Sequence, residues 1–133
     1  MRVLQPAGWP KPKGYANGIA AKGEIVFVAG TVGWTPEGKF ETDDLVGQLK
    51  QALLNTKAIL QEAGAGPEHV VRQTWYITDK REYLDNLPAV GAAWREVMGR
   101  NFPTMACMQV VALMEDRAKI EIETTAIVPS PVP

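Results

Sequence analysis

The sequence predicts an α+β fold in which two helices cover one face of a single mixed sheet. The apolar residues follow strand spacing in five short segments and helical spacing in two longer ones, in the order β-β-α-β-α-β-β. The chain has 133 residues, 46% of them hydrophobic, which is enough for one domain and too little for two ordinary ones. We therefore expect a single domain over residues 1–133, with an extended arm at 1–14 and an exposed tail at 129–133.

Two strands are expected before residue 33, at 15–21 and at 24–32. The second combines β-branched and aromatic residues between glycines, which is typical of a strand. Pro36 and Gly38 predict a turn after it.

The clearest helix follows this turn. Asp43 or Asp44 is a suitable N-cap, and Gly64 with Pro67 predicts where the helix ends. Its polar positions, Gln48 among them, are expected to face solvent, so the helix is amphipathic and covers the sheet. The apolar face consists of Leu45, Leu49, Ala52, Leu53, Thr56, Ile59, Leu60 and Ala63.

The second half of the chain contains three further strands and the second helix. Pro88 lies early in this helix and marks either a kink or a late start, and Gly99 ends the helix. The strands are expected at 69–78, 104–113 and 118–128, and the helix opens at 79–82.

The expected strand at 104–113 has apolar residues on both faces of the sheet. Alternate residues from Ala106 to Ala112 form one apolar set, and the set between them contains Met105 and Cys107. Two helices cover only one face of such a sheet, so the other face needs a partner. The simplest partner is the same face of another copy, which predicts a homo-oligomer with its sheets packed inward.

Composition excludes several classes of function. The 14 basic and 15 acidic residues give a net charge of −1 without a basic stripe, so no nucleic-acid partner is expected. Cys107 and His69 are the only cysteine and histidine, so neither an intrachain disulfide nor a metal site within the chain is expected. No apolar run approaches about 18 residues, so no membrane partner is expected. A free cysteine without an export signal predicts a cytoplasmic protein.

Short segments in a fixed order carry a resemblance to a known family. They are Gly14-Tyr15, Ile25 to Gly30, the helix from Gln48 to Gly64 with its Asn55, Val70-Val71, Tyr76 to Asp79, Asn101 to Pro103, Cys107, and Lys119 to Glu123. No single segment is diagnostic, but the ordered set at this length is specific. With these segments the chain resembles the RidA (YjgF) family of enamine/imine deaminases over residues 14–128.

The resemblance implies a chorismate-mutase-like fold with the element order given above. It also implies a homotrimer around an inner barrel, with ligands in clefts between subunits. Members of the family hydrolyse reactive enamines and imines, such as 2-aminoacrylate and its imine tautomer, to a keto acid and ammonia. They use no cofactor, so the expected partners are a small enamine, imine or related metabolite and the chain's own copies.

The resemblance also implies roles for individual positions. Tyr15 and Cys107 match residues of the family's cleft, and Glu121 matches the glutamate that positions the hydrolytic water. Ala29-Gly30 stands where the family has Ser-Gly, so only the backbone donor of Gly30 is available there.

Two positions depart from the family's pattern. Met105 stands where an arginine grips the substrate carboxylate, and Gly91 stands where an asparagine lines the cleft. Methionine offers no paired, charge-assisted hydrogen bond, so we expect a substrate other than 2-aminoacrylate. Arg72 and Arg117 are candidate replacement anchors, and the alternative for each is a solvated surface charge. Trp34, in a loop, is the tryptophan expected to reach the cleft and to mark a bulky or aromatic ligand.

Each implied site residue also has a plain structural alternative. Glu121 lies between two isoleucines on a strand, where it either takes a proton from attacking water or is solvated at the sheet edge. Cys107 has no histidine near it in sequence, so a cleft wall is favoured over a nucleophile, and a small buried residue is the alternative. Tyr15 is alternatively an aromatic residue of a subunit interface.

Two functions remain open. The first is an enamine/imine deaminase in which Tyr15 and Gly30 position the substrate and Glu121 activates water. The second is a non-catalytic, metabolite-binding or regulatory trimer on the same fold, which the departures at Met105 and Gly91 favour. A ribonuclease, the role described for some relatives, ranks third. The net charge is −1 and the sequence has no basic stripe that would bind a polyanion.

Overall fold

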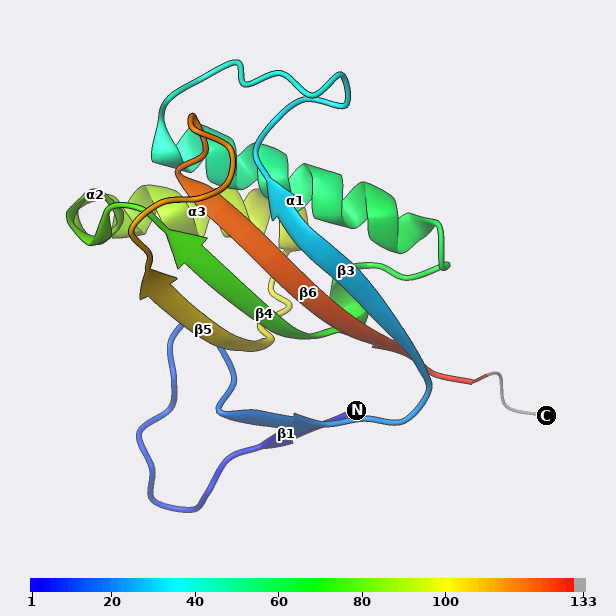
Figure 1. The fold of residues 1–133 in the computed structure, drawn as a ribbon. Helices are drawn as coiled ribbons and strands as arrows, with labels where there is room; N and C mark the ends of the chain where they lie inside the picture. The colour runs from blue at the N-terminus through cyan, green and yellow to red at the C-terminus, as the bar shows by residue number, and fades with distance from the viewer. Residues whose placement is uncertain (131–133) are drawn as a thin grey trace.

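Two helices lie across one face of a four-stranded sheet in the computed structural model, which describes residues 1–130 (Figure 1). The strand order is β3-β6-β4-β5, so β3 and β5 form the two edges of the sheet. The strands are β3 (Glu24–Val32), β6 (Ile120–Val128), β4 (Val70–Ile77) and β5 (Thr104–Gln109), and the covering helices are α1 (Leu45–Gln61) and α3 (Leu87–Met98). The α+β architecture is therefore as predicted.

The sheet is mixed because β6 runs antiparallel to both of its neighbours while β5 runs parallel to β4. Parallel neighbours need a crossover, and α2 (Lys80–Asp85) and α3 provide it. The register pairs Trp75 with Cys107 across β4 and β5, and Tyr76 with Glu121 across β4 and β6. Because successive side chains alternate between faces, Cys107 shares the helix-covered face with Trp75, and Glu121 lies on the opposite face.

Helix α1 begins where the sequence predicts, because the Asp44 carboxylate accepts a hydrogen bond from the backbone N–H of Gly47 at 2.8 Å. The predicted apolar face is buried against the sheet, apart from Ile59, which is 46% exposed, and Ala63, which is half-buried and follows the end of the helix.

The prediction that Gln48 faces solvent is wrong. Gln48 is fully buried, and its amide donates to the carbonyls of Thr42 and Arg117 at 3.0 and 2.9 Å. Its oxygen accepts from the backbone N–H of Lys119 at 2.7 Å. The Gln48 side chain thus supplies hydrogen-bond partners to backbone groups of two loops. A buried amide is tolerated when its polar atoms are hydrogen-bonded in this way.

The second helical region is divided in two at Asn86, where α2 ends and α3 begins. Pro88 lies in the first turn of α3, so of the two alternatives the late start is confirmed. At the other end of α3, Gly99 has a φ of 68°, a conformation in which glycine terminates a helix without strain.

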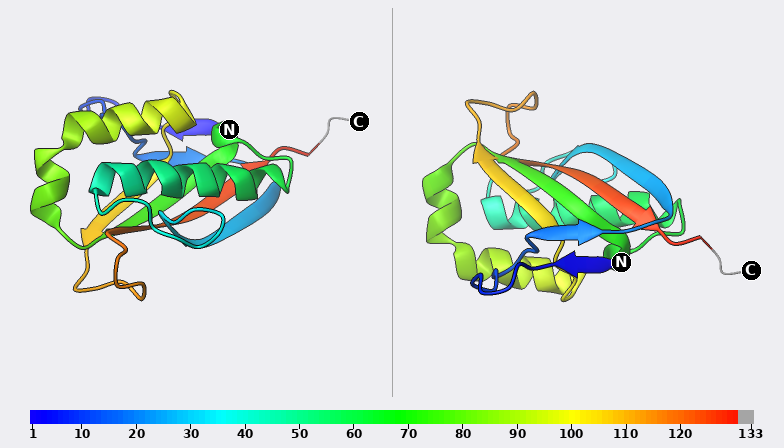
Figure 2. Two further views of the ribbon diagram at one scale, coloured as in Figure 1. Left: turned by 90° about the horizontal axis from the view of Figure 1, so that it is seen from above. Right: turned by 90° about the horizontal axis from the view of Figure 1, so that it is seen from below.

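The N-terminal segment forms a separate ladder in which β1 (Arg2–Leu4) pairs antiparallel with β2 (Gly18–Ala20). The expected strand at 15–21 therefore does not join the main sheet. Ala16 bridges this segment to the main sheet beside Thr104, and its N–H donates to the Pro103 carbonyl at 2.9 Å. The arm reverses direction after β1 and returns beside β5, which Figure 2 shows from below. Residues 131–133 of the expected tail lie outside the described part of the chain.

Strand β5 ends at Gln109 rather than at 113, because its partner β4 ends at Ile77. The N–H of Val110 makes the last contact, to the Ile77 carbonyl at 2.7 Å, and the following loop projects from the sheet (Figure 1). Strand β6 correspondingly starts at Ile120, two residues later than expected.

The face of the sheet opposite the helices carries exposed apolar side chains. Phe27 is 77% exposed, Ile25 is 56% exposed and Met108 is 42% exposed. Within residues 1–130, no helix is long and apolar enough to cross a membrane.

Candidate functional site

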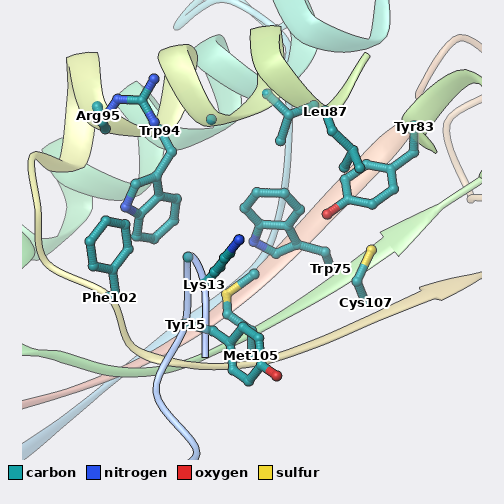
Figure 3. A pocket seen from close by; sticks show the side chains of 13 residues that line it. Lys13, Tyr15, Trp75, Tyr83, Leu87, Trp94, Arg95, Phe102, Met105 and Cys107 are labelled. Carbon is teal, nitrogen blue, oxygen red and sulfur yellow. The ribbon is translucent and has the colours of Figure 1, made fainter. Parts of the chain in front are cut away.

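The site residues suggested by the sequence gather around two separate pockets. Tyr15, Gly91, Met105 and Cys107 line a pocket of about 550 Å³ between β5 and the helices α2 and α3 (Figure 3). We call this the aromatic pocket, because Trp75, Tyr83, Trp94 and Phe102 also line it.

The aromatic pocket exists because β5 is the edge strand. Met105 and Cys107 pair with Gln73 and Trp75 of β4, so their side chains point to the helix-covered face. The helices leave a hollow over this edge strand. Tyr15 reaches the same hollow from the N-terminal arm, and its side chain is 43% exposed.

The aromatic floor of this pocket is fixed by packing and by hydrogen bonds. The Trp75 and Trp94 rings lie 6.0 Å apart, and Tyr83 meets Trp75 edge-on at 6.4 Å. The Trp75 indole N–H donates to the buried amide oxygen of Gln73 at 2.8 Å, and the Gln73 amide donates to the Thr124 hydroxyl at 3.1 Å. Trp75 and Trp94 are therefore core residues that also form the floor of the pocket.

Cys107 lies at the end of the pocket nearest Tyr83 (Figure 3). Desolvation raises the pKa of the Cys107 thiol, and the Tyr83 side chain lowers it in part. Desolvation also raises the pKa of the Tyr83 hydroxyl, with a further contribution from Cys107. Both groups therefore remain protonated near neutral pH, which suits a cleft wall better than a nucleophile.

Two cations line the aromatic pocket that the sequence analysis did not identify, namely Lys13 and Arg95. Arg95 lies one helical turn after Gly91, and its guanidinium folds back over that glycine. A Cβ at position 91 would lie 3.2 Å from Arg95 Nη1. The spacing of four residues on an expected helix is the signal that points to this contact. Nothing in the sequence of the arm indicates that Lys13 returns to β5.

The second pocket, of about 400 Å³, lies beside the other edge strand, β3, and is lined by Ala29, Gly30, Trp34 and Glu121. We call it the glutamate pocket. The Glu121 carboxylate rests against the backbone of Gly30, since a Cβ there would lie 2.6 Å from Oε2. Only glycine leaves this space open.

The Trp34 loop beside the glutamate pocket is held by Asn55 of α1. The Asn55 amide donates to the carbonyls of Val32 and Trp34, at 3.2 and 2.7 Å. The Trp34 ring in turn lies 5.9 Å from the Phe40 ring. These contacts fix the wall of the pocket that faces Glu121.

Neither candidate replacement anchor lines the pocket that contains Met105. Arg117 donates to the Asp43 carboxylate and to the Phe40 carbonyl, each at 3.0 Å, and its guanidinium carbon lies 5.7 Å from the centre of the Phe40 ring. Arg72 lines a third hollow, on the uncovered face of the sheet, together with Glu123 and Phe27.

Comparisons with known proteins find relatives over nearly the whole chain. The family model described as endoribonuclease L-PSP matches residues 10–128. A RutC family protein of Synechocystis is 34% identical, in a match that covers 98% of each chain. A human protein named 2-iminobutanoate/2-iminopropanoate deaminase is 29% identical over 95% of this chain and 89% of its own.

The fold is also that of solved Rid proteins. The crystal structure of YyfB from Yersinia pestis, a Rid family protein of unknown function, matches with a TM-score of 0.83. That match covers 96% of this chain and 98% of YyfB at 32% identity. The extent of these matches, over nearly the whole length of the chain, shows that this protein belongs to the RidA/YjgF family.

Proposed function

We propose that this protein is a cofactor-independent deaminase that hydrolyses a reactive enamine or imine to a carbonyl compound and ammonia. The observation that carries the proposal is the position of Glu121, whose carboxylate lies against Gly30 in the glutamate pocket. A carboxylate in such a pocket is placed to accept a proton from water. Relatives named 2-iminobutanoate/2-iminopropanoate deaminase, in human and in Salmonella typhimurium, support the same chemistry.

The proposed reaction needs only a proton acceptor and an electrophilic carbon. An enamine first takes up a proton on carbon and becomes an iminium ion, which is the protonated form of the imine. Water then adds to the C=N carbon while Glu121 accepts one of its protons, which gives a neutral carbinolamine. Glu121 returns this proton to nitrogen, the C–N bond breaks, and the hydroxyl proton leaves with the ammonia, so iminium plus water becomes a carbonyl compound plus ammonium.

The positions of the two pockets support a cleft shared between subunits. The aromatic pocket lies beside β5 and the glutamate pocket lies beside β3, and these strands are opposite edges of the sheet. In the homotrimer that we propose, the β5 edge of one copy meets the β3 edge of the next, which closes a ring of three. The uncovered apolar face with Phe27 and Ile25 would then face the centre.

A non-catalytic binding trimer is the second candidate. The observation that favours it is the chemistry of the aromatic pocket, whose lining includes neither a carboxylate nor a histidine. Cys107 there is exposed, and partial desolvation raises the pKa of its thiol, which does not favour a thiolate nucleophile. This pocket by itself is suited to binding a metabolite and not to hydrolysing it.

The test is ammonia release from freshly generated imines, ranging from small 2-imino acids to bulky and carboxylate-free ones. We expect the Glu121→Gln variant to lose at least about 100-fold in kcat/KM, the scale of a lost general base. Glu123→Gln is the matched control, because Glu123 lies on the same face of the same strand outside both pockets, and we expect a change of less than about threefold. Equal activity of the two variants would contradict the proposal, and no acceleration by the wild type on any imine would favour the binding trimer.

A further inference from the structure

The aromatic pocket has an unusual charge distribution. Its lining contains two cations, Lys13 and Arg95, and no acidic side chain. Within residues 1–130, neither cation forms an ion pair with a carboxylate, although five other ion pairs occur there. Two uncompensated positive charges over an apolar floor are complementary to an organic anion.

Arg95 is exposed, and its side chain turns back along α3 beside the lining of the pocket. Leu87, Gly91 and Arg95 are spaced by four residues along α3, so they share the face that lines the pocket. The guanidinium occupies the space beside Gly91, at 3.2 Å from where a Cβ would stand. The neighbouring Glu96 pairs with Lys50 at 2.8 Å and does not neutralise Arg95.

The two ends of the pocket differ in chemistry, as Figure 3 shows. Arg95 and Phe102 lie at one end, Cys107 and Tyr83 lie at the other, and Lys13 lies between them near Trp75. Met105 provides no charge in the middle of β5. The cations are therefore displaced from the Cys107 end along an aromatic surface.

The size of the pocket matches this separation. A volume of about 550 Å³ falls in the range of sites for drug-sized ligands and exceeds what a three-carbon acid fills. Leu87, in the wall of the pocket, is 46% exposed. A broad apolar group of a ligand would cover this side chain and remove its apolar surface from water, which favours binding. The exposed ring of Tyr15 in the same lining favours a planar group.

We infer that the substrate is an imine or enamine of a bulky, ring-containing carboxylic acid. Its carboxylate binds to Arg95 and Lys13, its apolar body lies against the exposed Tyr15 and Leu87 side chains, and its C=N group lies at the Cys107 end. Arg95 on α3 thus serves as the anion anchor in place of a residue at position 105. The apolar body of the substrate separates its carboxylate from the reacting carbon. This inference rests on the proposed function, since it identifies the substrate class for the same cleft.

The test uses para-acetylbenzoate, a stable ketone in which a ring separates the carbonyl group from the carboxylate. Its methyl ester removes the charge while keeping the ring, and pyruvate keeps the charge while removing the ring. Binding to the full-length protein is measured by calorimetry at fixed salt. We expect para-acetylbenzoate to bind at least about tenfold more tightly than either comparison ligand.

Four variants assign this preference to residues. In Arg95→Gln and in Lys13→Met, the advantage of para-acetylbenzoate over its methyl ester should decrease several-fold. Arg100→Gln and Lys11→Met remove equivalent charges from the end of α3 and from the arm, outside the pocket, and should retain the wild-type ratio. Equal binding of acid and ester by the wild type, tighter binding of pyruvate, or no binding of any of the three ligands would overturn the inference.

The same samples separate this inference from the proposed function. Binding as expected without hydrolysis of any imine would overturn only the deaminase proposal. Hydrolysis restricted to small 2-imino acids would overturn only the substrate class.

Discussion

The Glu121 carboxylate occupies the space that a side chain at position 30 would need, with Oε2 2.6 Å from the place of the missing Cβ. Gly30 on β3 and Glu121 on β6 thus form one unit, in which the glycine decides where the carboxylate lies. The contact involves the far end of a flexible side chain, so a methyl group at position 30 displaces the carboxylate and leaves the sheet in place.

We therefore expect Gly30→Ala to lose activity without losing stability. Ammonia release should fall at least about tenfold, because the general base is moved from its site. The free energy of unfolding should change by less than about 1 kcal/mol, since only a surface carboxylate relocates. Urea denaturation measured alongside the activity separates the two effects, and a fully active Gly30→Ala variant would show that the position of Glu121 does not matter.

A second prediction concerns the titration of Cys107. Desolvation raises its pKa, so the thiolate should form only at a pH above that of a cysteine in a short peptide. Because the folded state then holds its proton longer than the unfolded state, alkaline pH in this window destabilises the fold.

The ultraviolet absorbance of the thiolate, followed with pH, measures this titration. Tyr83→Phe removes the group that partly lowers the pKa of Cys107, so the midpoint should move upward still further. A wild-type midpoint at or below that of the peptide would contradict the desolvated environment.

A third prediction tests the buried amide of Gln48. Gln48→Leu leaves two loop carbonyls and the N–H of Lys119 without their partner, so we expect a loss of about 2–4 kcal/mol in the free energy of unfolding. Gln61→Leu, at the exposed end of the same helix, should change this free energy by less than about 0.5 kcal/mol. Urea denaturation gives both values, and similar results for the two variants would refute the bridging role.

A fourth prediction concerns the departure at position 105. Met105→Arg places a guanidinium on β5 beside Cys107, where a small 2-keto acid has no charged partner in the wild type. We expect pyruvate to bind at least about tenfold more tightly to this variant. Met105→Gln is the control for polarity without charge, and calorimetry measures the binding of pyruvate to both variants. If another residue already anchors small acids, neither variant will bind pyruvate more tightly than the wild type.

The helices and most strands could be predicted because their signals are local. The apolar face of α1 follows from spacing within one helix. The sequence narrows the cap to Asp43 or Asp44 and marks Pro88 as a kink or a late start, and the structure selects Asp44 and the late start of α3. Gln48 could not be assigned in this way, because its partners at Arg117 and Lys119 are about 70 residues away in sequence. The pairing of β2 with β1 likewise depends on the path of the arm and not on the residues of β2.

Only those parts of the candidate site could be predicted that follow from the alternation of side chains along strands and from the family resemblance. They identify Tyr15, Cys107 and Glu121, and the structure adds that these residues belong to two pockets. Lys13 depends on how a proline-containing arm returns to the sheet, which no periodicity encodes. Arg95 depends on the absence of a side chain at Gly91, and the spacing of the two on one helix was the available signal.

The placement of the two pockets at opposite edges of the sheet has a genetic consequence. In the proposed ring, each cleft takes one edge from each of two chains, so a defect at Glu121 and a defect at Arg95 damage different halves of the cleft. Two inactive alleles carrying these defects should complement each other when expressed together, because some clefts in the mixed rings receive two intact halves. A single allele that carries both defects should instead be dominant, because each chain of this kind inactivates both of the clefts to which it contributes.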